Sequence, residues 1–171
     1  NMTKKLDEFI TTHRNKFETR DNNKFAFSFS SITRYYQFLE IILERYAQAS
    51  SKFVQNTQQL TKSFKEGENG PVNKEQSKLL EDGRILYAYL HLEIESFYLF
   101  AKILLDRVAR SIELYFGVAR GLSLDSHDDL AKRIEKYCSE KKIILPKDFL
   151  AKINELKKEI SDFRDYEIAH E

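Results

Sequence analysis

Apolar side chains recur along this chain every three or four residues, which is the spacing of one face of an α-helix. The first long stripe predicts a helix over about residues 30–64, opening near Ser30 or Ser31, both good N-cap residues. The second predicts a helix over roughly residues 74–116, which Gly117 ends as the residue after the last turn. Residues 65–71, with two glycines and a proline, predict the loop between them.

Shorter helices are predicted on either side of this pair. One covers about residues 3–17. Ser126, with Asp129 three positions later, forms a capping-box pattern and opens a helix that ends near Glu140. Pro146 suits the first position of a final helix, since its fixed φ fits the first turn. The apolar face of that final helix consists of Phe149, Ile153, Leu156, Ile160 and Phe163.

Together these patterns predict an all-α fold, an antiparallel helical bundle of about five helices with two long central helices. Only five glycines and two prolines interrupt the helical periodicity. At 171 residues the chain is expected to form a single domain. Residues 1–27 are its N-terminal short helix and linker, and residues 28–171 are its bundle.

Composition narrows the functional classes. The formal net charge of +1 argues against a strongly basic nucleic-acid coat, although not against a local basic patch. Cys138 is the only cysteine, so no internal disulfide can form. No apolar run reaches the length of a membrane span and no signal-peptide core precedes the first helix. We therefore expect a cytoplasmic protein with no membrane partner.

The end of the chain carries the most informative chemistry. Leu156, Phe163 and His170 recur every seven positions, which places them within about 20° of one another on a helix. Arg164 follows Phe163 directly. A histidine can exchange a proton near neutral pH, and an arginine can bind a phosphate through two hydrogen bonds. From the residues alone, a histidine on this stripe is expected to face a core or a partner helix.

Arg164 and His170, with five residues between them and the polar Asp165 after the arginine, resemble the R-x(4–6)-H motif of HEPN domains. Residues 100–109, FAKILLDRVA, and residues 123–130, SLDSHDDL, also resemble the corresponding segments of that family. The resemblance covers residues 76–171. It implies a HEPN-like fold and metal-independent cleavage of RNA, as in toxin–antitoxin or defence systems.

The resemblance also implies roles and partners. Arg164 and His170 would be catalytic and Asp165 would assist them, at the cleft of a homodimer. RNA or a nucleotide would be the ligand, a cognate antitoxin protein a further partner, and no cofactor or metal would be needed.

Other interpretations stay open from the residues alone. Arg164 can form surface pairs with Asp162 or Glu167, and His170 can simply be a helix-end residue favoured by the helix dipole. The cleft could then hold a nucleotide or a partner protein without catalysis. A third interpretation is an unrelated helical protein in which residues 37–64 present an interaction surface.

Two acidic residues are candidates for supporting roles. Asp106 interrupts an apolar run, so its carboxylate must reach solvent or a partner. We favour an ion pair with Arg107 or Arg110 over a role in orienting Arg164 or His170. Glu93 falls on an apolar stripe and, if buried, needs a basic partner such as Arg164.

Metal binding is not predicted. His127, Asp128 and Asp129 follow Ser126 and are better explained as the first turn of a helix, where acidic residues favour the dipole. No second cluster has the spacing of metal ligands. Cys138 has no histidine close in sequence, so we expect a buried, unreactive thiol.

Overall fold

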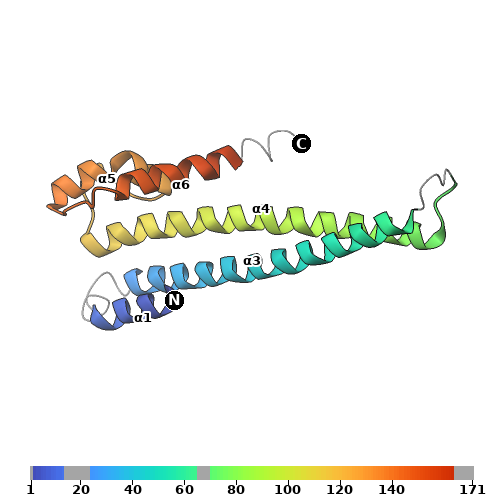
Figure 1. Cartoon of the computed structure of the whole chain (residues 1–171). Coiled ribbons are helices and arrows are strands. Elements are labelled where there is room, and N and C mark those ends of the chain that lie inside the picture. Colours follow the sequence, from blue (N-terminus) through green and yellow to red (C-terminus); the bar gives the residue numbers. More distant parts are fainter. Residues whose placement is uncertain (1, 14–23, 65–69, 164–171) are drawn as a thin grey trace. The chain divides into compact units, whose positions relative to one another are not determined.

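A computed structural model describes residues 2–13, 24–64 and 70–163, and the regular structure in these residues is entirely helical (Figure 1). The all-α prediction and the two long helices are confirmed. In chain order the helices are α1 (Met2–Thr12), α3 (Lys24–Ser63), α4 (Lys74–Phe116), α5 (His127–Lys141) and α6 (Phe149–Phe163).

The predicted helix boundaries hold best where a cap is present. α4 has the predicted bounds, and Gly117 follows it with φ of +89° while its N–H donates to the Glu113 carbonyl at 2.8 Å. Ser126 caps α5, since its side chain accepts from the Asp129 N–H. Lys142 ends α5 in the left-handed conformation, and its N–H donates to the carbonyls of Cys138 and Ser139.

Other boundaries differ from the prediction. α3 begins at Lys24 rather than near Ser30, because Phe25 and Phe29 are buried and continue its apolar stripe toward the N-terminus. Pro146 is not the first residue of α6; its carbonyl accepts from the Phe149 N–H in the turn that precedes the helix.

The chain divides into two compact units. Unit 1 comprises residues 1–37 and 100–171, and unit 2 comprises residues 38–99. Unit 1 has a core in which the end of α4, the following loop, α5 and α6 meet. The buried members of this core are Ala109, Ala119, Leu124, Leu130, Ile134, Tyr137, Cys138 and Ile153.

A second apolar cluster in unit 1 joins α1, the first turns of α3 and the last turns of α4. Phe25 and Phe29 are its buried members, and Phe9 stacks on Phe29 with ring centroids 5.5 Å apart. Tyr115 approaches Phe25 to 5.1 Å between centroids. Ser28 and Ser111 share a hydrogen bond of 2.8 Å beside this cluster. α3 and α4 are therefore antiparallel within unit 1.

Unit 2 is a helical hairpin made of the remaining parts of α3 and α4. Gln76, near the start of α4, donates its side-chain N–H to the Ser63 carbonyl at 2.9 Å, which satisfies the end of α3. Its side-chain oxygen accepts from the Asn73 N–H, and the Asn73 side chain accepts from the Gln76 N–H, both at 2.9 Å. One buried glutamine thus caps both helices and closes the hairpin.

The hairpin helices approach closely at Gly83. A Cβ added there would lie 2.9 Å from Oδ1 of Asn56, on the opposite helix. Further along, the Phe53 and Tyr87 rings are 6.4 Å apart, and Arg45 pairs with Glu93. The helices therefore run antiparallel along unit 2.

Candidate functional site

The predicted catalytic residues Arg164, Asp165 and His170 lie outside the described residues. The last described residue, Phe163, ends α6 immediately before Arg164. The geometry available for a candidate site is therefore that of the neighbouring elements in unit 1 and of the two supporting carboxylates.

Asp106 performs a different task from the predicted ion pair. Its Oδ1 accepts from the backbone N–H of His127 at 2.8 Å, so the carboxylate sits at the N-terminus of α5. Among the described residues it makes no ion pair with Arg107 or Arg110. An anion at a helix N-terminus satisfies an unpaired N–H and interacts favourably with the helix dipole. This tertiary hydrogen bond joins α4 to α5.

His127 lies beside that bond and is buried, with 6% of its surface exposed. Burial lowers the pKa of its imidazole below 6.5, against the opposing effect of the Asp106 carboxylate. Its Nε2 atom is buried and has no hydrogen-bond partner among the described residues. Such an orphan nitrogen favours the neutral form of His127, consistent with the direction of the pKa shift.

Asp128, the next residue, links α5 to α6. Its carboxylate accepts from Lys132 at 2.5 Å and pairs with Lys157 of α6. These two hydrogen bonds lower the pKa of Asp128 to about 2. The contacts of Asp106, His127 and Asp128 therefore connect all three helices α4, α5 and α6, and none of them requires a metal. The predicted capping role of residues 126–129 is confirmed.

Glu93 belongs to unit 2 and is buried, with 3% of its surface exposed. Its predicted basic partner exists, but it is Arg45 of α3, whose side chain is 56% exposed. This ion pair gives the buried carboxylate a basic partner, whereas Arg164 lies outside the described residues. Glu93 is better described as a contact that holds the hairpin together.

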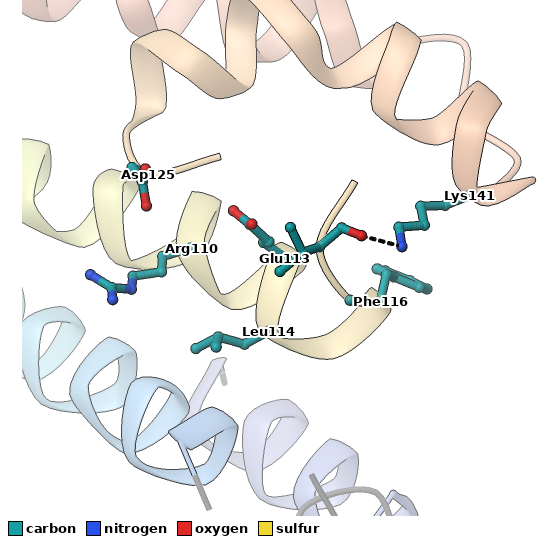
Figure 2. Close-up of a pocket in the computed structure, with 8 residues that line it drawn as sticks. Arg110, Glu113, Leu114, Phe116, Asp125 and Lys141 are labelled. Atoms are coloured by element: carbon teal, nitrogen blue, oxygen red, sulfur yellow. Dashed lines mark hydrogen bonds between the residues drawn. The ribbon is translucent and has the colours of Figure 1, made fainter. Parts of the chain in front are cut away.

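Unit 1 also has a pocket of about 640 Å³ at the junction of α4 with the loop before α5 (Figure 2). Its charged lining residues are Arg110, Glu113, Asp125 and Lys141, and its other lining residues are Leu114, Phe116, Gly117 and Val118. The pocket therefore combines an apolar lining with charged groups of both signs.

Most of those charged groups already stabilise the loop. Glu113 Oε2 accepts from the Leu124 N–H at 2.8 Å, and Lys141 Nζ donates to the Val118 carbonyl at 2.6 Å, the dashed line in Figure 2. Asp125 accepts from Ser123 at 2.7 Å. Arg110 makes no ion pair among the described residues and is the one lining cation of this pocket with no hydrogen bond to the loop. We regard the pocket as a structural junction with little free recognition chemistry.

The cysteine, possible metal ligands and possible membrane helices are the remaining features singled out in the sequence. Cys138 is buried in the unit 1 core, as predicted, and burial raises the pKa of its thiol. Across residues 2–13, 24–64 and 70–163, no three His, Cys, Asp or Glu side chains gather as metal ligands would. None of the helices in those ranges combines the length and the apolar character that a bilayer crossing requires.

Three comparisons with known proteins found no counterpart, since no family model, curated protein or solved structure matches this chain. The HEPN resemblance therefore depends on the residues quoted for it above.

The sequence analysis missed two capping residues that their spacing could have identified. Asn73 and Gln76 have the spacing of a capping box, with asparagine in place of serine or threonine. Glu113 had no such signal, because its partners lie about ten residues further along an irregular loop. Contacts of that kind depend on tertiary packing.

Proposed function

We propose that this chain is a HEPN-like protein that cleaves RNA without a metal ion, using Arg164 and His170 at a cleft between two copies. One observation supports this most. Two of the segments on which the resemblance rests are connected in unit 1, since Asp106 of the first accepts from the backbone N–H of His127 in the second. Asp128 of the second segment also pairs with Lys157 of α6, the helix that ends just before the motif. Connected segments are what a shared fold would require.

The proposed chemistry needs only groups that this motif provides. His170 exchanges a proton with the attacking 2′-hydroxyl or with the leaving oxygen, which its pKa range allows near neutral pH. Arg164 binds the phosphate and stabilises the negative charge that builds up on its oxygens. Asp165 assists by orienting one of these side chains.

Asp106 fits this proposal as a positioning residue. Because it fixes the start of α5, and α5 packs on α6, its loss would displace the helix that leads into Arg164. Glu93 needs no such role, since Arg45 already neutralises it.

The test is RNA cleavage in EDTA by the wild-type chain beside Arg164→Ala and His170→Ala. We expect cleavage by the wild type and its loss in both variants. Lys158→Ala is the matched control, because it removes an exposed cation from α6, just before the motif in sequence, and should leave cleavage unchanged. Cleavage by His170→Ala at the wild-type rate would refute the catalytic assignment.

A second candidate is a HEPN-like binding or scaffolding domain without catalysis. The charge around the motif favours it, because Arg164 is accompanied in residues 161–171 by Asp162, Asp165, Glu167 and Glu171. Four carboxylates repel an RNA backbone. A wild-type chain that cleaves no RNA in a broad set, but binds a nucleotide or a partner such as an antitoxin in calorimetric titrations, would support this function.

The third candidate, an unrelated helical interaction protein, is favoured by the surface of unit 2. Most large hydrophobic side chains that are exposed in the described residues lie there. Those exposed in unit 2 are Phe38, Ile41, Leu43, Tyr46, Val54, Phe64, Val72, Leu80, Ile85, Tyr87, Tyr89, Leu92 and Leu99. This candidate would be favoured over the first two if substitutions of these exposed side chains abolished the binding of helical partner proteins and no RNA cleavage were seen in the wild type or any variant.

A further inference from the structure

His127 is a buried titratable side chain that the proposed chemistry does not use. It is the first residue of α5, and its backbone N–H donates to Oδ1 of Asp106 on α4 at 2.8 Å. Only 6% of its surface is exposed, and its buried Nε2 atom has no partner among the described residues. The imidazole therefore lies inside the packed part of unit 1, away from solvent.

The charged groups that act on this imidazole come from three helices. They are Asp106 of α4, Asp128 of α5 and Lys157 of α6. Both carboxylates already have partners, since Asp106 accepts from the backbone N–H of His127, and Asp128 pairs with Lys132 and Lys157. The two carboxylates favour a protonated imidazole, whereas the Lys157 ammonium disfavours it.

Three further features make a proton on the buried imidazole unfavourable. Protonation turns both ring nitrogens into N–H donors, and the described residues offer no acceptor to Nε2. The N-terminus of a helix carries a partial positive charge, so a cation in the first turn of α5 is disfavoured. Burial separates the charge from water and is the largest cause that lowers the pKa of His127. Together these effects outweigh the attraction of the two carboxylates.

The same proton becomes favourable once α5 leaves α4, because the imidazole then contacts water. A free imidazole has a pKa of about 6.5, so at pH 5.0 its protonated form exceeds the neutral form by about 30-fold. An open form that binds the proton more tightly than the closed form gains population as the pH falls. The closed form is therefore fully favoured above about pH 6.5 and loses stability below it.

Release of α5 and α6 does not require the rest of unit 1 to unfold. These two helices pack on the end of α4 through one core, whose members include Leu130 and Ile153. The apolar cluster around Phe25 and Phe29 has, within the described ranges, no member from α5 or α6. Proteins open locally in such contiguous units at a lower free energy than complete unfolding. α5 and α6 can therefore leave α4 together while that cluster stays packed.

We propose that His127 is a pH-sensitive latch, whose protonation releases α5 and α6 from α4 and exposes the apolar core that they share. A histidine that changes charge between pH 5 and 7 is suited to such a switch, because a small change in pH then shifts a two-state equilibrium. The latch uses none of Arg164, Asp165 and His170, and the inference does not rest on RNA cleavage.

Cys138, the only cysteine of the chain, provides the test because it is buried in the core that the latch would open. A pyridyl disulfide reagent labels this thiol only when it is exposed. The labelling rate of the folded chain, divided by that of the urea-unfolded chain at the same pH, gives the opening equilibrium. We expect this ratio to rise between pH 7.5 and pH 5.0, by at most about 30-fold, the limit for one imidazole. An unchanged ratio would overturn the proposal.

Two variants assign the response to its residue. His127→Gln keeps a polar side chain that cannot be protonated, so its ratio should be the same at both pH values. His91→Gln is the matched control, because His91 lies in unit 2 and its variant should respond as the wild type does. A rise that persists in His127→Gln, or one that both variants lose equally, would overturn the assignment to His127.

A measurement on the wild type keeps the proposal testable if His127→Gln does not fold. The dependence of Cys138 labelling on urea concentration at pH 5.0 scales with the surface that opening exposes. Release of α5 and α6 alone should give a slope well below that of complete unfolding followed by circular dichroism. Equal slopes would mean that the whole chain unfolds, and the latch would be wrong. None of these readouts uses RNA, so they are separate from the test of the proposed function.

Discussion

The two units are built from the same two long helices and yet differ in how they are stabilised. In unit 1 the last turns of α4 pack against α5 and α6, and the largest fully buried side chains are Tyr137, Leu124, Leu130 and Ile134. In unit 2 two helices have only each other within the unit. The contrast shows that an amphipathic repeat makes a core only when a third element covers it.

The units also differ in where their buried polar groups act. In unit 1, Tyr137 donates to the Gly117 carbonyl at 2.7 Å from within an apolar core. In unit 2, the buried polar side chains Gln76 and Glu93 reach the opposite helix, Gln76 at the Ser63 carbonyl and Glu93 at Arg45. We therefore expect the stability of unit 1 to depend most on the volume of its buried side chains. The stability of unit 2 should depend most on its buried polar side chains keeping their partners.

The largest expected effect comes from making the same substitution in each unit. Leu124→Ala should lower the free energy of unfolding by about 2–5 kcal/mol, because the side chain is fully buried and its removal leaves a cavity. Leu80→Ala, at a position of unit 2 that is 47% exposed, should cost less than about 1 kcal/mol. Urea denaturation followed by circular dichroism measures both. Equal losses would mean that unit 2 has a core comparable to that of unit 1.

The ion pair of unit 2 should show an asymmetric response. Arg45→Ala leaves the Glu93 carboxylate buried without a partner and should cost about 1–3 kcal/mol, less than for a fully buried pair because the Arg45 side chain is 56% exposed. Glu93→Leu removes the charge and should leave stability within about 1 kcal/mol of the wild type, or raise it. Thermal denaturation of both variants checks this order. A Glu93→Leu variant less stable than Arg45→Ala would contradict it.

The closing contact of the hairpin should have a smaller effect. Gln76→Ala removes hydrogen bonds that satisfy the end of α3 and the start of α4, and should cost about 1–2 kcal/mol. Hydrogen exchange should be faster at the amides of residues 73–80 in this variant than in the wild type, and unchanged in α5. Faster exchange throughout the chain would instead indicate global destabilisation.

The smallest effect is a pH dependence specific to unit 1. His127 has a lowered pKa because of burial, so the unfolded state binds a proton there first and stability falls as the pH drops below about 6.5. The pKa of Asp128 is lowered to about 2 by Lys132 and Lys157, so its contribution is complete above about 4 and lost as the pH approaches 2. Because Asp128 is half exposed, that contribution should not exceed about 1 kcal/mol.

Urea midpoints measured from pH 8 to pH 3 test this dependence. Asp128→Asn should flatten the part of the profile below pH 4, and His127→Gln should flatten the part between pH 5 and 7. A profile that neither substitution changes would show that other groups control acid sensitivity.

Local signals allowed much of the fold to be predicted. The bounds of α4, the Ser126 cap of α5 and Gly117 after α4 all follow from residues within one turn of the feature they determine. The start of α3 was predicted too late, because Phe25 and Phe29 depend on contacts with Phe9 and Tyr115.

The candidate site was less accessible to sequence reasoning. Asp106 was singled out correctly as a carboxylate that needs a partner, but the partner is the N–H of His127 rather than an arginine on its own helix. Glu93 was expected to pair with a basic residue, and its partner among the described residues is Arg45 of α3. In both cases the need for a partner was local, while the choice of partner was not.

The sequence by itself therefore determined the helical periodicity, the capping residues and the motif Arg164-Asp165…His170, because each depends on residues close together in the chain. The tertiary structure alone decided which helices share a core and which apolar faces remain exposed. Burial depends on what packs against a helix face, and two stripes with the same spacing in α4 have different surroundings in the two units. The exposure of Ile85, Tyr89, Leu92 and Leu99, which share one face of α4, could be recognised only from the tertiary structure.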